Sequence, residues 1–151
     1  MTITLVAIHN EHVRLRAMIA ALRQAPRSAE YRVAAASIAL AAGERVAGTI
    51  LGDDGTPSHY LILLPASAED LTWNDAMQWA AKQGGALPTR REQSLLFANL
   101  KHAFDERYYW SCEQHDKNAG WAWCQHFTDG VQNYRRLSSE FRARAVRRAS
   151  V

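Results

Sequence analysis

The stretch Trp121-Ala-Trp-Cys-Gln-His-Phe127, followed by Thr128-Asp129-Gly130, decides the fold. Its odd-numbered residues up to 127 fall on one face of an extended chain and include both tryptophans. Its even-numbered residues, alanine, cysteine and histidine, fall on the other face. Asp129-Gly130 is a tight-turn signal. The stretch therefore predicts one strand of an antiparallel sheet with an aromatic core.

Similar short runs lie on both sides of this strand. Residues 108–113, 131–137 and 141–148 each have strand character, and turn residues separate them. Three of the five tryptophans fall between residues 108 and 148. The last third of the chain therefore predicts a multi-stranded sheet, in which residues 114–120 form an exposed polar loop.

An earlier β-hairpin is predicted over residues 45–64. Residues 46–51 form its first strand, and Asp53-Asp54-Gly55 is its turn. Residues 59–64 form the returning strand, which we expect Pro65 to end.

Two short helices are predicted between this hairpin and the later strands. Thr72 with Asp75, and Thr89 with Glu92, have the spacing of a capping box, in which an N-cap hydroxyl and an acid three residues later satisfy free backbone N–H groups. Gly84-Gly85 ends the first helix. Strands, two helices and further strands together predict an α+β domain.

The N-terminal residues 3–24 predict an amphipathic helix, which Pro26 follows. Its apolar seam has spacings of 3, 4, 3, 4 and 3 residues, as in a coiled coil. The seam residues are Leu5, Ile8, His12, Leu15, Ile19 and Leu22. The seam could pack on the chain's own domain or on further copies, as a dimer or a trimer. We therefore divide the chain into an oligomerisation helix (1–26), a lead-in (27–44) and a domain (45–151).

Size and composition are those of a globular protein with one domain. The chain has 151 residues, of which 48% are hydrophobic and 22% charged. No stretch reaches the roughly 18 apolar residues of a membrane span. Charged and histidine residues interrupt residues 9–16, where a signal peptide would be apolar. We expect synthesis in the cytoplasm without export, which is compatible with a place in a virion.

The net charge of +3 is unevenly distributed. Residues 135–151 hold six arginines and one acid, Glu140. This end could meet phosphate or another anion. The alternative, which we favour, is that the arginines pair with acids and stack on aromatic side chains.

No catalytic residue, metal site or cofactor is predicted. Trp73-Asn74-Asp75 has the letters of a calcium-lectin motif, but Asp75 is better explained as a helix-capping acid. One polar cluster has no defensible metal spacing: Glu113, His115, Asp116, His126 and Asp129. Cys112 and Cys124 are expected to be a buried pair of free thiols, with a cross-strand disulfide as the alternative.

The order of elements and a set of short motifs resemble the C-type-lectin-like superfamily. Within it the chain is similar to a bacterial and prophage family of uncharacterised domains, related to the C-terminal domain of a bacterial collagen-like adhesin. The motifs are Gly43-Glu44-Arg45, Ala47-Gly48, His59-Tyr60-Leu61-Ile62-Leu63-Leu64, Trp73, Ala76, Leu87-Pro88-Thr89-Arg90, Glu92-Gln93, Leu96-Phe97-Ala98-Asn99, Tyr109-Trp110-Ser111-Cys112-Glu113, Trp123, Phe127, Asp129-Gly130 and Arg144-Ala145-Val146-Arg147-Arg148.

The resemblance covers about residues 40–149 and implies a C-type-lectin-like fold with a role in recognition. It implies a structural signature made of Trp110, Trp123, Phe127, Asp129, Gly130, Arg144, Val146 and Arg147. It implies no reaction. We therefore expect a non-enzymatic module of phage or prophage origin that binds a protein or a glycan, without a membrane partner.

The candidates for ligand binding lie outside the motifs, apart from Glu113, and are chosen because aromatic, amide and arginine side chains recur in recognition surfaces. They are Glu113, His115, Trp121, Gln125, Gln132, Asn133, Tyr134 and Arg135. Trp121 could equally belong to the core, as we expect for Trp110 and Trp123. Two other functions stay open: binding of nucleic acid or another anionic partner through the basic end, and an enzyme of the formylglycine-generating type that uses the cysteines.

Overall fold

The computed structural model describes residues 4–24 and 35–151. The chain separates into two compact units, Met1–Ala35 and Ala36–Val151. The first part of the predicted lead-in, residues 27–34, lies outside the described residues. Its last part, residues 36–44, belongs to the second unit, where Glu44 and the carbonyl of Ala39 accept hydrogen bonds from Arg147.

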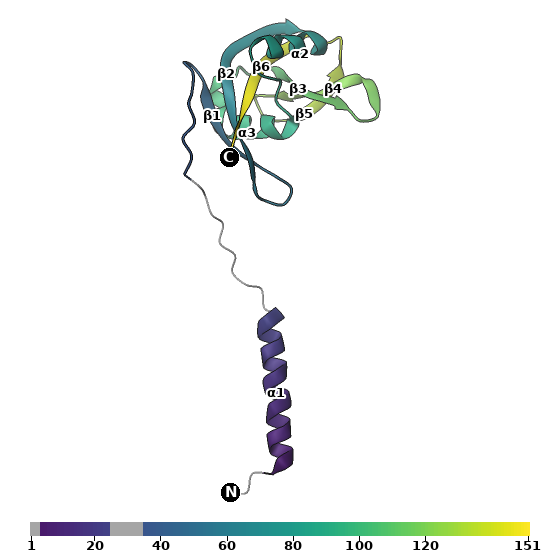
Figure 1. Ribbon diagram of the computed structural model, residues 1–151. Helices are drawn as coiled ribbons and strands as arrows, with labels where there is room; N and C mark the ends of the chain where they lie inside the picture. Colours follow the sequence, from purple (N-terminus) through teal and green to yellow (C-terminus); the bar gives the residue numbers. More distant parts are fainter. Residues whose placement is uncertain (1–3, 25–34) are drawn as a thin grey trace. The chain divides into compact units, whose positions relative to one another are not determined.

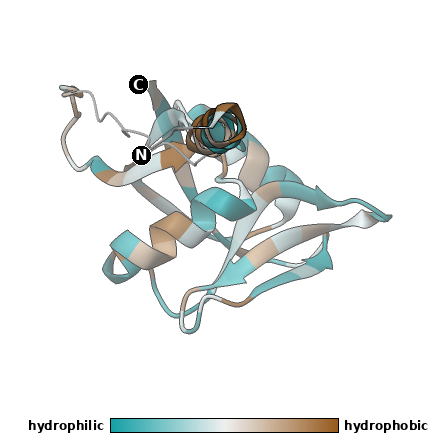
Figure 2. Cartoon of the chain, turned by 90° about the horizontal axis from the view of Figure 1, so that it is seen from below, coloured by the Kyte–Doolittle hydropathy of each residue, from teal (hydrophilic) through white to brown (hydrophobic). Residues whose placement is uncertain are grey.

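The first unit contains helix α1, Leu5–Gln24, which confirms the predicted N-terminal helix (Figure 1). None of its residues is buried. Seen end-on and coloured by hydropathy, α1 carries both apolar and polar segments (Figure 2). Within residues 4–24 and 35–151, no helix combines the length and the apolarity that crossing a membrane requires.

The second unit is an α+β domain built on a mixed six-stranded sheet (Figure 1). In chain order its elements are β1 (Arg45–Leu51), β2 (Pro57–Leu71), α2 (Trp73–Lys82), α3 (Arg90–Leu100), the 3₁₀ turn η1 (Lys101–Ala103), β3 (Tyr108–His115), β4 (Asn118–His126), β5 (Gln132–Arg136) and β6 (Phe141–Ser150). The strand order is β1-β2-β6-β3-β4-β5. Neighbours are antiparallel except β3 and β6, which meet in parallel at Tyr109 and Arg142.

The two long helices lie on opposite faces of this sheet, because neighbouring residues of one strand enter different cores. Tyr109 packs in the core beneath α3, with Leu96 and Phe127. Trp110 packs in the core beneath α2, with Ala76. We call these two sides the α3 face and the α2 face. Both predicted caps are present, since Thr72 and Thr89 each accept a hydrogen bond from the backbone N–H three residues later.

The prediction that Pro65 ends its strand is wrong, because β2 continues to Leu71. Pairing between β2 and β6 breaks between Leu63 and Ser67, so Pro65 lies in a bulge. Pairing with β1 begins only at Leu63, so β1 provides no partner beside Pro65. A bulge at the end of a neighbouring strand tolerates a residue without a backbone N–H.

The prediction of a loop over residues 114–120 is also wrong. β3 continues to His115 and β4 begins at Asn118, so only Asp116 and Lys117 form the turn. Residues 114–120 are therefore mostly strand, and the β3–β4 hairpin is longer than its polar sequence indicated. Most of the other predicted strands also end one or two residues away from the observed bounds.

Candidate functional site

The candidate site lies on the α3 face of β3, β4 and β5. Along β4, Ala122 and Cys124 enter the core beneath α2. Trp121 and Trp123 therefore lie on the α3 face, where both are half-buried. The register of β5 pairs Tyr134 with Trp123 and Arg136 with Trp121.

Four aromatic rings form a continuous cluster here, which we call the aromatic platform: His115, Trp121, Trp123 and Tyr134. Tyr134 is at its centre, with ring centroids 5.8 Å from Trp121, 5.3 Å from Trp123 and 4.4 Å from His115. His115 and Trp123 are nearly parallel, with centroids 5.6 Å apart. Tyr134 is 38% exposed, so solvent reaches the middle of the platform.

Two guanidinium groups lie over the tryptophans. Arg90, the first residue of α3, has its Cζ 3.6 Å from the centroid of Trp123. Arg136, on β5, has its Cζ 5.5 Å from the centroid of Trp121. Both distances are within the range of cation–π attraction, which is worth about 0.5–1 kcal/mol at exposed sites.

A chain of amide side chains connects the platform to the core. The side-chain N–H₂ of Gln132 donates to the Arg90 carbonyl at 2.6 Å and to Gln125 Oε1 at 2.9 Å, while its Oε1 accepts from Arg90 Nε at 3.1 Å. Gln125 donates onward to the carbonyl of Gln93, and Gln93 donates to the carbonyl of Tyr109. Gln93 and Gln125 are buried. Arg90 is thus held over Trp123 by a chain that begins in the core.

Glu113 also positions Arg90, through a hydrogen bond to its backbone. Its Oε1 accepts the N–H of Arg90 at 3.0 Å, which satisfies a donor that the first turn of α3 leaves free. A carboxylate is also favoured at a helix N-terminus by the helix dipole. Glu113 therefore has a positioning role within the protein, and its predicted ligand role stays a prediction.

The structure brings together most of the predicted ligand-binding residues, though not all. Six of the eight lie at the platform or in its support: Glu113, His115, Trp121, Gln125, Gln132 and Tyr134. Among them, Gln125 is buried at 1% exposure and is not available to a ligand. Asn133 and Arg135 alternate with Tyr134 and fall on the α2 face. There Arg135 lies over the ring of Tyr108 and donates to its hydroxyl.

Three residues of the platform region were assigned otherwise or missed. Trp123 was predicted to be core and is only half-buried. Its alternation with Trp121 was the available signal. Arg136 is two residues from Tyr134, so strand periodicity could have found it. No sequence signal places Arg90 over Trp123, because that contact depends on how α3 packs.

The other signature residues have structural roles. Trp110, Phe127 and Val146 are buried, and Arg144 donates to the carbonyls of Leu64 and Ala103. Asp129 accepts the N–H of Val131. Gly130 has a φ of +80°, and Phe97 occupies the position that a Cβ would need.

The polar cluster seen in the sequence does not form one site. His126 pairs with Tyr108 at the start of β3, whereas His115 is at the end of that strand. The length of β3 separates the two histidines. Among residues 4–24 and 35–151, no three metal-ligating side chains are grouped closely enough to hold an ion.

Of the two cysteines, Cys124 is buried in the core as predicted, whereas Cys112 is only partly buried against it. Both are free, and Cys124 is paired across the hairpin with Trp110 rather than with Cys112. Burial raises the pKa of the Cys124 thiol to about 12 and also raises the pKa of Cys112. A nucleophilic or metal-binding cysteine requires the thiolate, which such environments disfavour.

The arginines of the basic end are mostly engaged within the protein, as we favoured from the sequence. Arg142 pairs with Glu69 and Asp105, Arg147 with Glu44, and Arg148 with Glu92. Hydrogen bonds from Arg147 and from the Ala41 N–H lower the pKa of Glu44 to about 2. These pairs neutralise much of the charge that a nucleic acid would meet.

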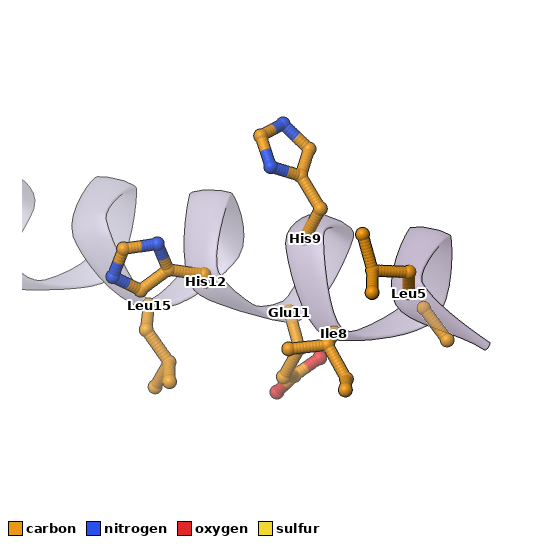
Figure 3. A pocket seen from close by; sticks show the side chains of 7 residues that line it. Leu5, Ile8, His9, Glu11, His12 and Leu15 are labelled. Carbon is orange, nitrogen blue, oxygen red and sulfur yellow. The ribbon is translucent and has the colours of Figure 1, made fainter. Parts of the chain in front are cut away.

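The seam residues of α1 are exposed on the surface of that helix. Leu5 is 87% exposed, and Ile8, Leu15, Ile19 and Leu22 are exposed as well. Ile8 and Leu15 project to the same side of α1, whereas His9 projects to the other (Figure 3). The hollow around these residues is lined by one helix alone, so it is an open helix flank rather than an enclosed site.

Comparison with known proteins adds no family. Neither protein-family models nor curated proteins match this chain.

Proposed function

We propose that this protein is an oligomeric, non-enzymatic recognition module with a C-type-lectin-like domain that binds a protein or a glycan. We place it in a phage or prophage setting on the resemblance of its motifs. The observation that supports the binding role is the aromatic platform, which is half-exposed and continuous although the sheet has two well-filled cores.

The composition of the platform favours binding over a purely structural role. Tryptophan, tyrosine and arginine are the side chains that contribute most at protein interfaces. Here Arg90 is held by the amide chain from Gln93 to Gln132 and by the Glu113 cap. Rigid side chains lose little conformational entropy on binding, so the platform is prepared for a ligand.

Oligomerisation through α1 is the second part of the proposal. The apolar seam is exposed in the single chain, and a seam of this spacing is buried when parallel helices associate. Joining two or three platforms would raise a weak affinity through avidity.

The binding role is tested by capture of ligands on arrays of glycans and proteins. A Trp121→Ala/Tyr134→Ala variant removes the platform. Asn133→Ala/Arg135→Ala is the matched control, because it alters the same strand on its other face. We expect wild type and control to bind a common ligand that the platform variant loses. Equal retention by all three proteins would refute the assignment of the platform.

The oligomer is tested by multi-angle light scattering of the full chain. Leu15→Asp/Ile19→Asp places charges in the seam, and Ala17→Asp/Gln24→Asp is the control, which adds the same charge on the opposite side of the helix. We expect a dimer or trimer for wild type and control, and a monomer for the seam variant. A monomeric wild type at micromolar concentration would refute the avidity argument.

A further inference from the structure

The two arginines of the platform have free binding groups. Arg90 uses only its Nε, which donates to Gln132. Within residues 4–24 and 35–151, the terminal N–H groups of Arg90 and all those of Arg136 have no hydrogen-bond partner. Arg90 is held against the ring of Trp123, with its Cζ 3.6 Å from the centroid, whereas the Cζ of Arg136 lies 5.5 Å from the centroid of Trp121.

A guanidinium stacked on a ring directs its N–H edge sideways, where two donors in a planar fork match the two oxygens of a carboxylate. Stacking also weakens the competition from water for one face of the group. The Arg90–Trp123 pair is therefore preorganised for bidentate binding of a carboxylate, and the guanidinium of Arg136, near Trp121, is a second binding group on the other side of Tyr134.

Tyr134 lies between these two pairs. Its ring is edge-on to both tryptophans, at interplanar angles of 78° and 79°. Tyr134 is the most exposed of the four platform residues. The arrangement is a cationic group on each side of an amphipathic aromatic centre. It complements a segment with acidic side chains on either side of an apolar one.

The same geometry disfavours a ligand that stacks on the indole rings. A sugar or a nucleic-acid base would need an open tryptophan face, and Arg90 covers a face of Trp123 at 3.6 Å. We propose that the platform binds an acidic segment of a partner protein through paired Arg–carboxylate contacts on both sides of Tyr134. This inference rests on the proposed function and names its ligand class.

The experiment measures fluorescence anisotropy of labelled poly-L-glutamate with the full-length protein at low salt. We expect saturable binding that weakens by about tenfold or more in Arg90→Gln/Arg136→Gln. Arg23→Gln/Arg107→Gln removes the same charge elsewhere and should remain within about twofold of wild type. Equal weakening in both variants would refute a site at the platform.

A second variant separates the bidentate geometry of the guanidinium from its positive charge. Arg90→Lys/Arg136→Lys keeps both cations but cannot make bidentate contacts, so we expect affinity between those of wild type and the glutamine variant. Affinity equal to that of wild type would overturn the bidentate contact. Circular dichroism and thermal unfolding establish that each variant is folded.

Two further probes compare ligand classes. Dextran sulfate and oligothymidylate should bind more weakly than poly-L-glutamate, and their residual binding should not depend on Arg90 and Arg136. Tighter, arginine-dependent binding of either would refute the protein ligand in favour of an anionic glycan or a single-stranded nucleic acid. If poly-L-glutamate fails while an array ligand still depends on Trp121 and Tyr134, this inference fails and the proposed function stands.

Discussion

Both faces of the β3–β4 hairpin carry tryptophans, which are buried on one face and half-exposed on the other. On the α2 face, Trp110 is fully buried, packs on Phe141 and donates its Nε1–H to the carbonyl of Leu71. On the α3 face, Trp121 and Trp123 are half-buried beneath arginine side chains. The difference teaches that a tryptophan's role in this sheet depends on what covers it: apolar side chains of α2 pack in the core of Trp110, whereas arginine side chains lie over Trp121 and Trp123.

The small residues explain how the covered face is filled. Ala76 and Ala80 of α2 and Ala143 and Ala145 of β6 lie in the same core as Trp110. A large ring beside small partners allows the helix to approach the sheet closely. The α3 face of β4 and β5 has large side chains from both strands, and the polar amide chain separates them from the hydrophobic core.

The largest effect on stability is expected for Trp110→Ala. Removing a fully buried ring should destabilise the protein by about 3–5 kcal/mol, because the remaining core cannot close the cavity. Urea unfolding followed by circular dichroism measures the loss. A loss below about 1 kcal/mol would show that the α2 face is not a packed core.

The next test concerns Glu92, which anchors the start of α3 at the edge of the platform. Burial would raise the pKa of Glu92, but hydrogen bonds from Arg148 and the Thr89 N–H outweigh it and lower that pKa. Glu92→Gln should cost about 3 kcal/mol at neutral pH, the lower end for a buried ion pair, because Arg148 is partly exposed.

The pH dependence gives the sign of this effect. Because the folded pKa of Glu92 lies below its unfolded value, its contribution is present above the ordinary pKa of about 4.5 and is lost as the pH falls through the folded value. The free-energy difference between wild type and Glu92→Gln should therefore shrink in acid. Glu106→Gln, at an exposed acid, is the control. A difference that grows in acid would contradict the assigned ion pair.

A smaller effect is expected for Gln125→Ala, which breaks the amide chain between core and platform. Gln93 and Gln132 would each lose a partner, at a cost of about 1–3 kcal/mol for buried groups left unsatisfied. Chemical denaturation measures this cost. Affinity for poly-L-glutamate should fall as well, since Gln132 positions Arg90. Full affinity in a destabilised variant would show that the amide chain is not needed to position Arg90 for binding.

The smallest effect on stability is expected for Trp121→Ala. Its half-buried ring contributes an edge contact with Tyr134 and a cation–π contact, so we expect a loss of about 1 kcal/mol or less. Ligand binding should be lost nonetheless. Thermal unfolding and the array assay, performed on the same preparation, measure both quantities. A loss comparable to that of Trp110→Ala would remove the contrast between the two faces.

The sequence predicted the features that depend on local chemistry. The caps at Thr72 and Thr89, the α1 helix and the alternation of residues 121–127 follow from neighbours in the chain, and the structure contains them. The α+β class follows from the order of such elements. The C-type-lectin-like assignment stays a proposal.

The sequence did not predict features that depend on contacts between distant segments. Pro65 lies inside a strand because the register with β6 leaves a bulge there. Trp123 is half-buried because the cover above its ring is the side chain of Arg90 rather than an apolar side chain. Arg90 reaches Trp123 only after α3 has docked, and 32 intervening positions hold no periodic signal for that contact.

Strand β6 has a consequence for how the domain is made. It lies between β2 and β3, so it is the strand that joins β1–β2 to β3–β4–β5. During translation, residues 45–136 leave the ribosome before β6 exists, and both inner edges stay unpaired. Unpaired edges are sites of aggregation. Folding of this sheet should therefore wait for residues 141–150, and nascent chains that stall before them should depend on chaperones.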